Sequence, residues 1–221
     1  DALPIFVKPI LDARGVKGGF PMQTNAPGSV GYMSWAQVKQ LHDEGHEIIA
    51  HTTDHGHVND GSGLTEAQKR AKVDNRSAFE SHDIPAPRGF AYTFGENDAN
   101  LRRIVRDYYE YALATTTGSG SQSPLSTYCI RRIAIKDSTV TADHYAQIDA
   151  AITNNEILVF IIHSGSGPAE FTSGGGGYQR LADVLDYAIA HDVPVVGWRG
   201  RHVNGLRLWK AEAGEPVDLA R

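Results

Sequence analysis

The sequence has only one cysteine, Cys129, in 221 residues. A single thiol excludes an internal disulfide framework and a cysteine-based zinc site, and we expect it to be free and buried. Long hydrophobic runs are also missing. The longest, residues 157–162, has the length of a strand and falls well short of the roughly 18 residues that a membrane helix needs. We therefore expect no disulfide-stapled scaffold and no membrane span.

An excess of positive charge is missing as well. The chain has 21 basic and 26 acidic residues, so its formal net charge is −5. Nucleic-acid-binding proteins present a basic face, so we expect no nucleic acid partner, and a neutral or basic polymer is easier to accommodate. Hydrophobic residues make up 41% of the chain, which is ordinary for a globular domain. No sequence pattern indicates an oligomeric state.

Helix-like and strand-like segments alternate along the whole chain, which is typical of a βα architecture. The expected helices cover residues 4–14, 34–44, 65–82, 98–110, 141–153 and 178–191. The expected strands cover residues 16–22, 47–52, 89–94, 111–116, 128–135, 157–163 and 193–198. About seven strands with intervening helices predict an α/β fold, a parallel barrel that forms one domain over residues 1–221. Because the chain opens on a helix, we expect the first strand of the barrel to be missing just ahead of Asp1.

Two histidines spaced four residues apart lie at the end of the expected strand 47–52 and in the loop after it, at positions 51 and 55. In barrels of this type, functional residues lie where strands end and the following loops begin. Zinc proteases carry the same spacing on a helix, but Thr52 stands where that motif needs Glu. Two histidines on one loop suit a divalent metal. Since the chain has ten histidines, two ordinary loop histidines are the alternative, and we expect the nearby His57 to be a solvated loop residue.

His163 ends a second strand, the hydrophobic segment 157–162, which we expect to be buried on both faces. A histidine at the mouth of a barrel is a candidate general acid or base. A hydrogen-bonded core histidine is the alternative. Aromatic residues near the strand ends, Tyr92, Phe94 and above all Trp198, are candidates for stacking on sugar faces, and Trp35 is a weaker one.

Four stretches of the chain share their order and spacing with a known family. Residues 45–55 resemble the second motif of polysaccharide deacetylases (carbohydrate esterase family four), a Gly-His-Glu-Ile phrase followed by two histidines. Residues 90–96 resemble the third motif and residues 159–163 the fifth. Residues 16–20 resemble the strand that follows the first helix in that family. The similarity extends over roughly residues 1 to 200.

The resemblance implies a distorted (β/α) barrel and a metal-dependent hydrolase that removes acetyl groups from an acetylated polysaccharide. By this resemblance Asp1, His51 and His55 would bind the metal, which we expect to be Zn²⁺, with Ni²⁺ or Co²⁺ as alternatives. His163 would protonate the leaving group, and the backbone N–H of Phe94 would stabilise the oxyanion.

Two side chains of the fifth motif, Val159 and Ile161, would line the pocket for the acetyl methyl group in this resemblance. The family also implies an extracytoplasmic, secreted or particle-borne protein.

The chain departs from the family at several supporting positions. The first motif is absent as such, and the catalytic base that it carries would lie one residue ahead of Asp1. Ala91 replaces an arginine that orients the base, and Thr93 replaces a proline. The fourth motif, which tunes the acid histidine, is not recognisable. Its nearest candidates are Arg132, Asp137 and Asp143, each of which we expect instead to be a solvated surface charge.

Two other function classes compete with the deacetylase. A barrel that binds glycan without turning it over, within a larger assembly, would fit the departures from the family. A glycoside hydrolase would need a pair of carboxylates about 5–10 Å apart. Glu96 and Asp54 are the only obvious acids at the strand ends, so we rank the hydrolase third.

Overall fold

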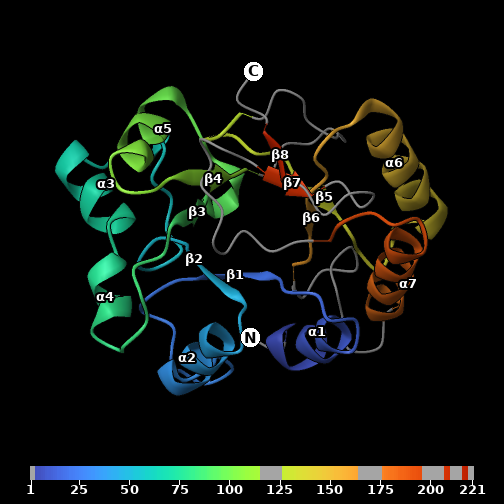
Figure 1. Cartoon of the computed structure of the whole chain (residues 1–221). Coiled ribbons are helices and arrows are strands. Elements are labelled where there is room, and N and C mark those ends of the chain that lie inside the picture. The colour runs from blue at the N-terminus through green and yellow to red at the C-terminus, as the bar shows by residue number, and fades with distance from the viewer. Residues whose placement is uncertain (1–2, 115–125, 164–175, 196–206, 210–215, 219–221) are drawn as a thin grey trace. The chain divides into compact units, whose positions relative to one another are not determined.

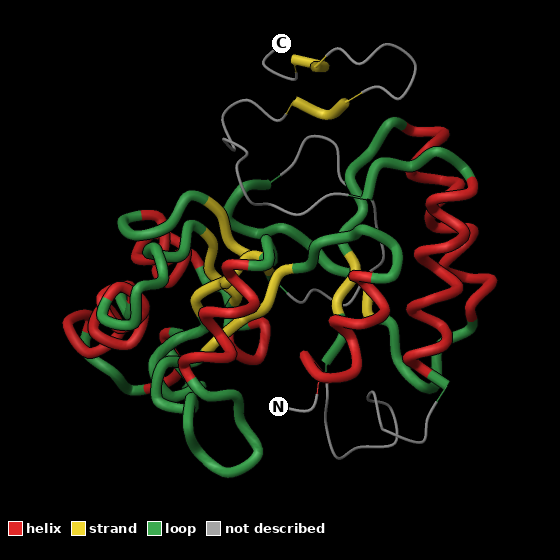
Figure 2. Tube along the Cα trace, turned by 60° about the horizontal axis from the view of Figure 1, so that its bottom comes forward, coloured by secondary structure: helices red, strands yellow, loops and turns green. Residues whose placement is uncertain are grey.

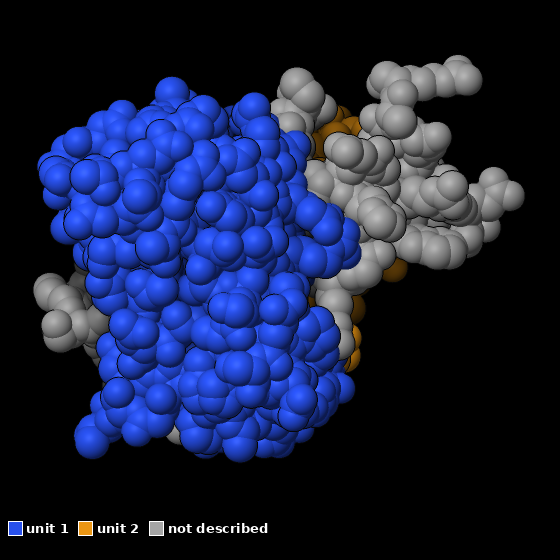
Figure 3. Space-filling view, turned by 90° about the vertical axis from the view of Figure 1, so that its left-hand side faces the viewer, with its two compact units in different colours: residues 1, 19–118, 124–132 blue, residues 2–18, 119–123, 133–221 orange. Residues whose placement is uncertain are grey.

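The computed structural model describes residues 3–114, 126–163, 176–195, 207–209 and 216–218. They divide into two compact units, which Figure 3 colours separately. Among the described residues, the first unit holds residues 19–114 and 126–132, and the second holds residues 3–18, 133–163, 176–195, 207–209 and 216–218.

The first unit is built on a parallel sheet whose strand order is β1-β2-β3-β4. These strands are β1 (Gly19–Met22), β2 (Glu47–Ala50), β3 (Gly89–Ala91) and β4 (Tyr111–Leu113), labelled in Figure 1. Each is shorter than the segment expected from the sequence. Leu113 forms one further parallel bridge with Ile130. Since neighbouring strands are parallel, the residues that follow them lie at one edge of the sheet.

Helices α2 to α5 lie along one side of this sheet (Figures 1 and 2). Their bounds are Trp35–Asp43 for α2, Glu66–Val73 for α3, Arg76–Glu80 for α4 and Ala99–Arg106 for α5. Two short 3₁₀ helices, η1 (Asp60–Ser62) and η2 (Thr93–Gly95), complete the unit. Ser34 and Thr65 each form a full capping box with the glutamine three residues on, and Asp98 caps α5. These caps confirm the helix starts expected from the sequence.

The helix expected over residues 65–82 is two helices, because distant groups bond to the chain at the break. The Tyr109 hydroxyl donates to the backbone oxygen of Val73 over 2.7 Å. The backbone N–H of Thr53 donates to the oxygen of Lys72 over 3.0 Å. The buried Asn75 side chain donates to the oxygen of Thr52 over 2.7 Å. The break between α3 and α4 therefore fixes the loop that follows β2.

An apolar core packs within the first unit. It combines side chains from β2 and β3 with the inner faces of α3 and α5, and it includes Ala50, Val58, Val73, Phe90, Tyr92, Leu101, Ile104, Val105, Tyr109, Ala112 and Ala114. Burial of this cluster is the main force that holds the helices on the sheet.

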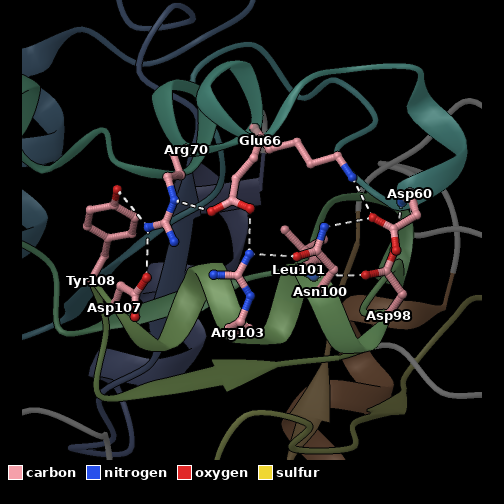
Figure 4. A network of polar contacts seen from close by, with 10 residues as sticks. Asp60, Glu66, Arg70, Asp98, Asn100, Leu101, Arg103, Asp107 and Tyr108 are labelled. Atoms are coloured by element: carbon pink, nitrogen blue, oxygen red, sulfur yellow. Dashed lines mark hydrogen bonds and ion pairs between the residues drawn. The ribbon is translucent and has the colours of Figure 1, made fainter.

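A network of charged side chains joins α3, α5 and η1 at the surface of this unit (Figure 4). Glu66 accepts hydrogen bonds from Arg70 over 2.9 Å and from Arg103 over 2.7 Å. The buried Lys69 donates to Asp60 over 2.6 Å. That contact holds the pKa of Asp60 below its ordinary value, with a smaller contribution from Asn100. The network fixes the segment around Asp60 between the two helices.

The second unit contains α1 (Leu3–Asp12), β5 (Ile133–Ala134), α6 (Thr141–Asn154), β6 (Phe160–Ile161) and α7 (Gly177–Ala190). Strands β5 and β6 pair in parallel, with Ile133 opposite Phe160. Arg14, just past α1, forms a bidentate ion pair with Asp186 of α7. Its Nε and Nη2 atoms each lie 2.7 Å from a carboxylate oxygen of Asp186. Strands β7 (Arg207–Trp209) and β8 (Pro216–Asp218) form an antiparallel pair that we did not expect.

Two strand predictions in the second unit are corrected. The segment 157–163 is a strand only at β6, and residues 157–162 are half-buried rather than buried on both faces. In the described part of the chain β6 has a single ladder partner, β5. Residues 193–195 are not a strand, and residues 196–198 lie outside the described residues. Parallel pairing in both units agrees with the expected α/β class. None of the described helices has the length and hydropathy to cross a bilayer.

Candidate functional site

His51 directly follows β2, at the carboxyl edge of the parallel sheet. Its Nδ1 atom lies 2.6 Å from the backbone oxygen of Ala91, the last residue of β3. A carbonyl oxygen can only accept, so Nδ1 carries the hydrogen and Nε2 carries the lone pair. This is the tautomer that a histidine needs to bind a metal through Nε2, with a backbone carbonyl orienting its ring.

His55 lies beside His51, with the ring centroids 4.8 Å apart and the planes at 74°. The loop between them has an unusual backbone, because Thr52 and His55 both have positive φ, 56° and 57°. The backbone N–H of His55 donates to the Thr52 hydroxyl over 3.0 Å, and Asn75 holds the backbone oxygen of Thr52. The fold therefore brings the two histidines together by constraints beyond their own segment.

The two histidines fit a transition metal through their ligand type and through the tautomer of His51. Among the described residues, no third side chain of a ligand type joins this pair. Asp1, the third ligand implied by the resemblance, lies outside the described residues.

Phe94 stands next to the histidines with a strained backbone. It lies in η2 with φ 54° and ψ 7°, a left-handed conformation that is uncommon for a bulky residue. The residue is 56% exposed. Two backbone hydrogen bonds close the turn, from the N–H of Gly95 to the oxygen of Tyr92 and from the N–H of Glu96 to the oxygen of Thr93. Neither of them uses the N–H of Phe94.

Two imidazole rings pack against Phe94. His55 contacts it edge-on at 4.8 Å and 81°, and His57 stacks on it at 4.1 Å and 16°. His57 Nδ1 also lies 2.8 Å from Glu96 Oε1. His57 is a loop residue whose side chain is 59% exposed, as expected, and it also contacts Phe94 and Glu96, which we did not expect. Sequence reasoning missed the His57–Glu96 pair. The alignment of their two loops at one sheet edge is the signal that could have indicated it.

The loop after β2 and the loop after β3 are joined at three points. The Thr93 hydroxyl donates to the oxygen of Gly56 over 2.9 Å, and His57 bonds to Glu96. Farther along, the N–H of Asp60 donates to Asp98 over 2.7 Å, as Figure 4 shows. The strained residues of both loops are thus held by contacts from outside their own turns.

The acids that a glycoside hydrolase would use are each paired with a basic side chain. Asp54 forms an ion pair with Lys72, which lowers the pKa of that carboxyl below its ordinary value. Glu96 is bonded to His57.

The structure does not support a substrate contact for Tyr92. Its side chain is 1% exposed, and its hydroxyl donates to the backbone oxygen of Tyr128 over 3.0 Å. Burial raises the pKa of this hydroxyl. Trp35 stacks on His82 at 4.1 Å. Trp198 lies outside the described residues.

Two further expectations about burial are corrected. Cys129 is half-buried rather than buried, and its thiol lies 3.5 Å from Asn97 Oδ1. Arg132 is 8% exposed and donates through Nε to the oxygen of Ala114 over 3.0 Å, so it is not a solvated surface charge. Burial lowers its pKa to about 10. Of the other two candidates, Asp143 is exposed as expected, whereas Asp137 is half-buried.

The fifth-motif residues lie in the second unit. His163 is exposed, so the alternative of a core histidine is wrong. Val159 and Ile161 are half-buried, and their backbone oxygens accept hydrogen bonds from Ile133 over 2.8 Å and Ile135 over 2.9 Å. These hydrogen bonds hold β5 and β6 in parallel register as far as Ile161, two residues before His163.

Comparison with known proteins bears directly on this site. The sequence model described as polysaccharide deacetylase matches residues 7–112, a stretch that includes His51, His55 and Phe94. No curated protein sequence matches the chain.

Several solved structures have a similar fold. A family 4 carbohydrate esterase from Streptomyces lividans, in complex with acetate, aligns with a TM-score of 0.58 at 14% identity, covering 99% of this chain and 92% of that one. The Xyl-CE4 domain of a multidomain xylanase from the hindgut metagenome of Trinervitermes trinervoides gives 0.55 at 15% identity, with 89% and 80% covered. A Streptococcus pyogenes deacetylase gives 0.52 at 17% identity, and the chain spans 59% of its length.

Proposed function

Residues 7–112 of this chain belong to the polysaccharide deacetylase family, and from this premise we propose that the protein is a metal-dependent hydrolase that removes acetyl groups from an acetylated polysaccharide. The observation that carries the proposal is the hydrogen bond from His51 Nδ1 to the oxygen of Ala91, with the ring of His55 4.8 Å away. It leaves the lone pair of His51 on Nε2, where it is available to bind a metal.

His51 and His55 would hold the metal together with Asp1, and we propose Zn²⁺, with Ni²⁺ or Co²⁺ as alternatives. When bound, such an ion polarises the acetyl carbonyl and lowers the pKa of a water molecule. The protein's part is to fix the two imidazoles, which the Asn75 and Ala91 contacts achieve.

Phe94 would provide an oxyanion donor through its backbone N–H. The proposal is supported by the left-handed backbone at this residue and by a turn whose two hydrogen bonds use other N–H groups. A donor that is fixed before the reaction stabilises developing charge without reorganisation, which makes such groups effective.

The remaining roles are proposed for residues of the second unit. His163 would protonate the leaving amine or alcohol, and its exposure leaves it open to solvent and substrate. Val159 and Ile161 would line the pocket for the acetyl methyl group. Trp198 would contact a sugar ring. We further propose that residues 1–221 form a single catalytic domain, a distorted (β/α) barrel of about seven parallel strands, in an extracytoplasmic setting.

The decisive experiment combines metal analysis of the purified protein with an acetate-release assay on acetylated glycans, each with and without chelator. The proposal predicts one tightly held transition metal and acetate release that the chelator abolishes. Glycan binding without acetate release would favour the glycan-binding barrel instead. Absence of any bound metal would contradict the ligand assignment of His51 and His55.

A further inference from the structure

We propose that Glu96 is a positioning residue that acts through His57 to hold Phe94 in its left-handed conformation, and so fixes the direction of the Phe94 N–H. The part of this inference that concerns catalysis rests on the proposed function. The part that concerns the contacts of Glu96, His57 and Phe94, which we call the clamp, does not, because it follows from contacts within the first unit.

The backbone of Phe94 needs an external constraint. A non-glycine residue at φ 54° is in a left-handed conformation that is unfavourable relative to the ordinary ones, because its Cβ lies too close to the following carbonyl oxygen. Strain of this kind persists only where the surrounding structure over-determines it. Burial of the ring does not provide the constraint, since the residue is 56% exposed. The contacts of the ring with His55 and His57 are therefore the obvious source.

Of these two rings, His57 covers a face of Phe94 and His55 meets it edge-on. An exposed imidazole loses rotamer freedom when it stacks, so the stack is weak unless another group fixes the ring. Glu96 does so, because Oε1 accepts a hydrogen bond from His57 Nδ1 over 2.8 Å. A carboxylate acceptor makes this bond stronger than one to a neutral group.

Glu96 holds Phe94 from two directions. Its backbone N–H closes the turn around Phe94 by bonding to the oxygen of Thr93 over 3.1 Å. Its side chain fixes the ring that stacks on Phe94. Its second oxygen, Oε2, is buried and has no hydrogen-bond partner among the described residues. Burying such an oxygen is costly, so the contact with His57 has to offset a penalty that a surface glutamate would not have.

The clamp is tested first without any turnover, by the amide NMR signals of Phe94 and Gly95. Glu96→Ala should shift both signals and speed the exchange of the Phe94 amide, whereas Glu96→Gln should stay close to wild type because its side-chain oxygen still accepts from His57. Asp43→Ala is the matched control, since it breaks the His42–Asp43 pair of α2, another histidine–carboxylate contact. Unchanged amide signals in Glu96→Ala would overturn the proposal.

Kinetics then test the consequence of the clamp. Removing an oxyanion donor outright lowers kcat by roughly 10²–10³-fold. Misdirecting one should cost less, so Glu96→Ala is expected to lower kcat about tenfold with KM nearly unchanged, and Glu96→Gln to restore most of the loss.

Glycine adopts positive φ freely. In a Phe94→Gly background, Glu96→Ala should therefore add no further loss, and an equal loss in both backgrounds would contradict a positioning role. A wild-type protein that releases no acetate would refute the proposed function, and the amide signals would still decide on the clamp.

Discussion

The hydrogen bond between His51 and Ala91 joins the imidazole that follows β2 to the backbone of the neighbouring strand β3. Nδ1 of His51 donates to the oxygen of Ala91 over 2.6 Å. The register of β2 and β3, which sets Ala50 opposite Phe90, brings these two groups together. Because the acceptor is a main-chain oxygen, side-chain substitution at position 91 cannot remove it. The sheet itself thus determines which nitrogen of His51 is available to a metal.

Loss of either proposed metal ligand should abolish metal binding and activity together. We expect His51→Ala and His55→Ala to purify without the metal, since each removes an imidazole nitrogen from the ligand set. His163→Ala should retain the metal and lose most of the rate. Elemental analysis and acetate release measure both effects. His82→Ala, which removes a histidine stacked on Trp35, is the control and should change neither. Full metal content in His51→Ala would show that the ligand assignment is wrong.

Asn75 should matter for stability more than its place between two helices suggests. Its side chain donates to the oxygen of Thr52 over 2.7 Å and accepts from the Tyr109 hydroxyl over 3.0 Å. Asn75→Ala leaves the buried Thr52 oxygen without this donor, which should cost about 1–3 kcal/mol in the free energy of unfolding. Urea unfolding checks this. Asn100 is half-buried, but its hydrogen bond to Asp60 lies at the exposed surface, so Asn100→Ala should cost less, about 0.5 kcal/mol. Equal losses would contradict the role given to Asn75.

Local signals predicted much of the fold of the first unit. Helix starts at Ser34, Thr65 and Asp98 depend on residues within one turn, so the sequence contains what is needed to find them. The break between α3 and α4 depends on Thr53 and Tyr109, which are distant in sequence. No pattern within residues 65–82 could show that these partners compete for the backbone of the helix.

The candidate site likewise combines residues that the sequence could predict with contacts that it could not. The family motifs identified His51, His55 and Phe94. In the structure the ring of His55 contacts the ring of His51 and the ring of Phe94. The pairing of His57 with Glu96 joins two loops 39 positions apart and depends on strand order. Arg132 is a parallel case, because a charged residue is expected at the surface unless its main-chain acceptor, here Ala114, is known.

Asp98 should contribute more than an ordinary helix cap. Its Oδ1 accepts from the N–H of Leu101 over 2.8 Å, and its Oδ2 accepts from the N–H of Asp60 over 2.7 Å. A cap alone is worth about 1 kcal/mol. Asp98→Ala should therefore destabilise more than Ser34→Ala, which removes only a cap, and Asp98→Ser should fall between them. Hydrogen exchange should also accelerate at Asp60 in Asp98→Ala. Equal losses in Ser34→Ala and Asp98→Ala would indicate that the second contact adds nothing.

Acid should weaken the second unit partly through Asp12. Lys8 and then Lys17 bond to its carboxylate, over 2.5 and 3.0 Å, and lower its pKa to about 2. An unfolded aspartate titrates near ~3.9. Because the folded pKa is the lower one, the contribution to stability is complete above about pH 4 and is lost as the pH falls towards 2. The side chain is 31% exposed, so solvent screening makes the effect modest.

Asp12→Asn isolates this contribution, because the amide keeps the shape of the side chain and loses its charge. The difference in thermal midpoint between wild type and Asp12→Asn should be constant from about pH 7 to 5, shrink below about pH 4 and approach zero near pH 2. Asp143→Asn, at an exposed aspartate of α6 that forms no ion pair with a basic side chain among the described residues, is the matched control and should show little difference at any pH. A difference for Asp12→Asn that does not change between pH 6 and 2 would show that its lysine contacts contribute no pH-dependent stability.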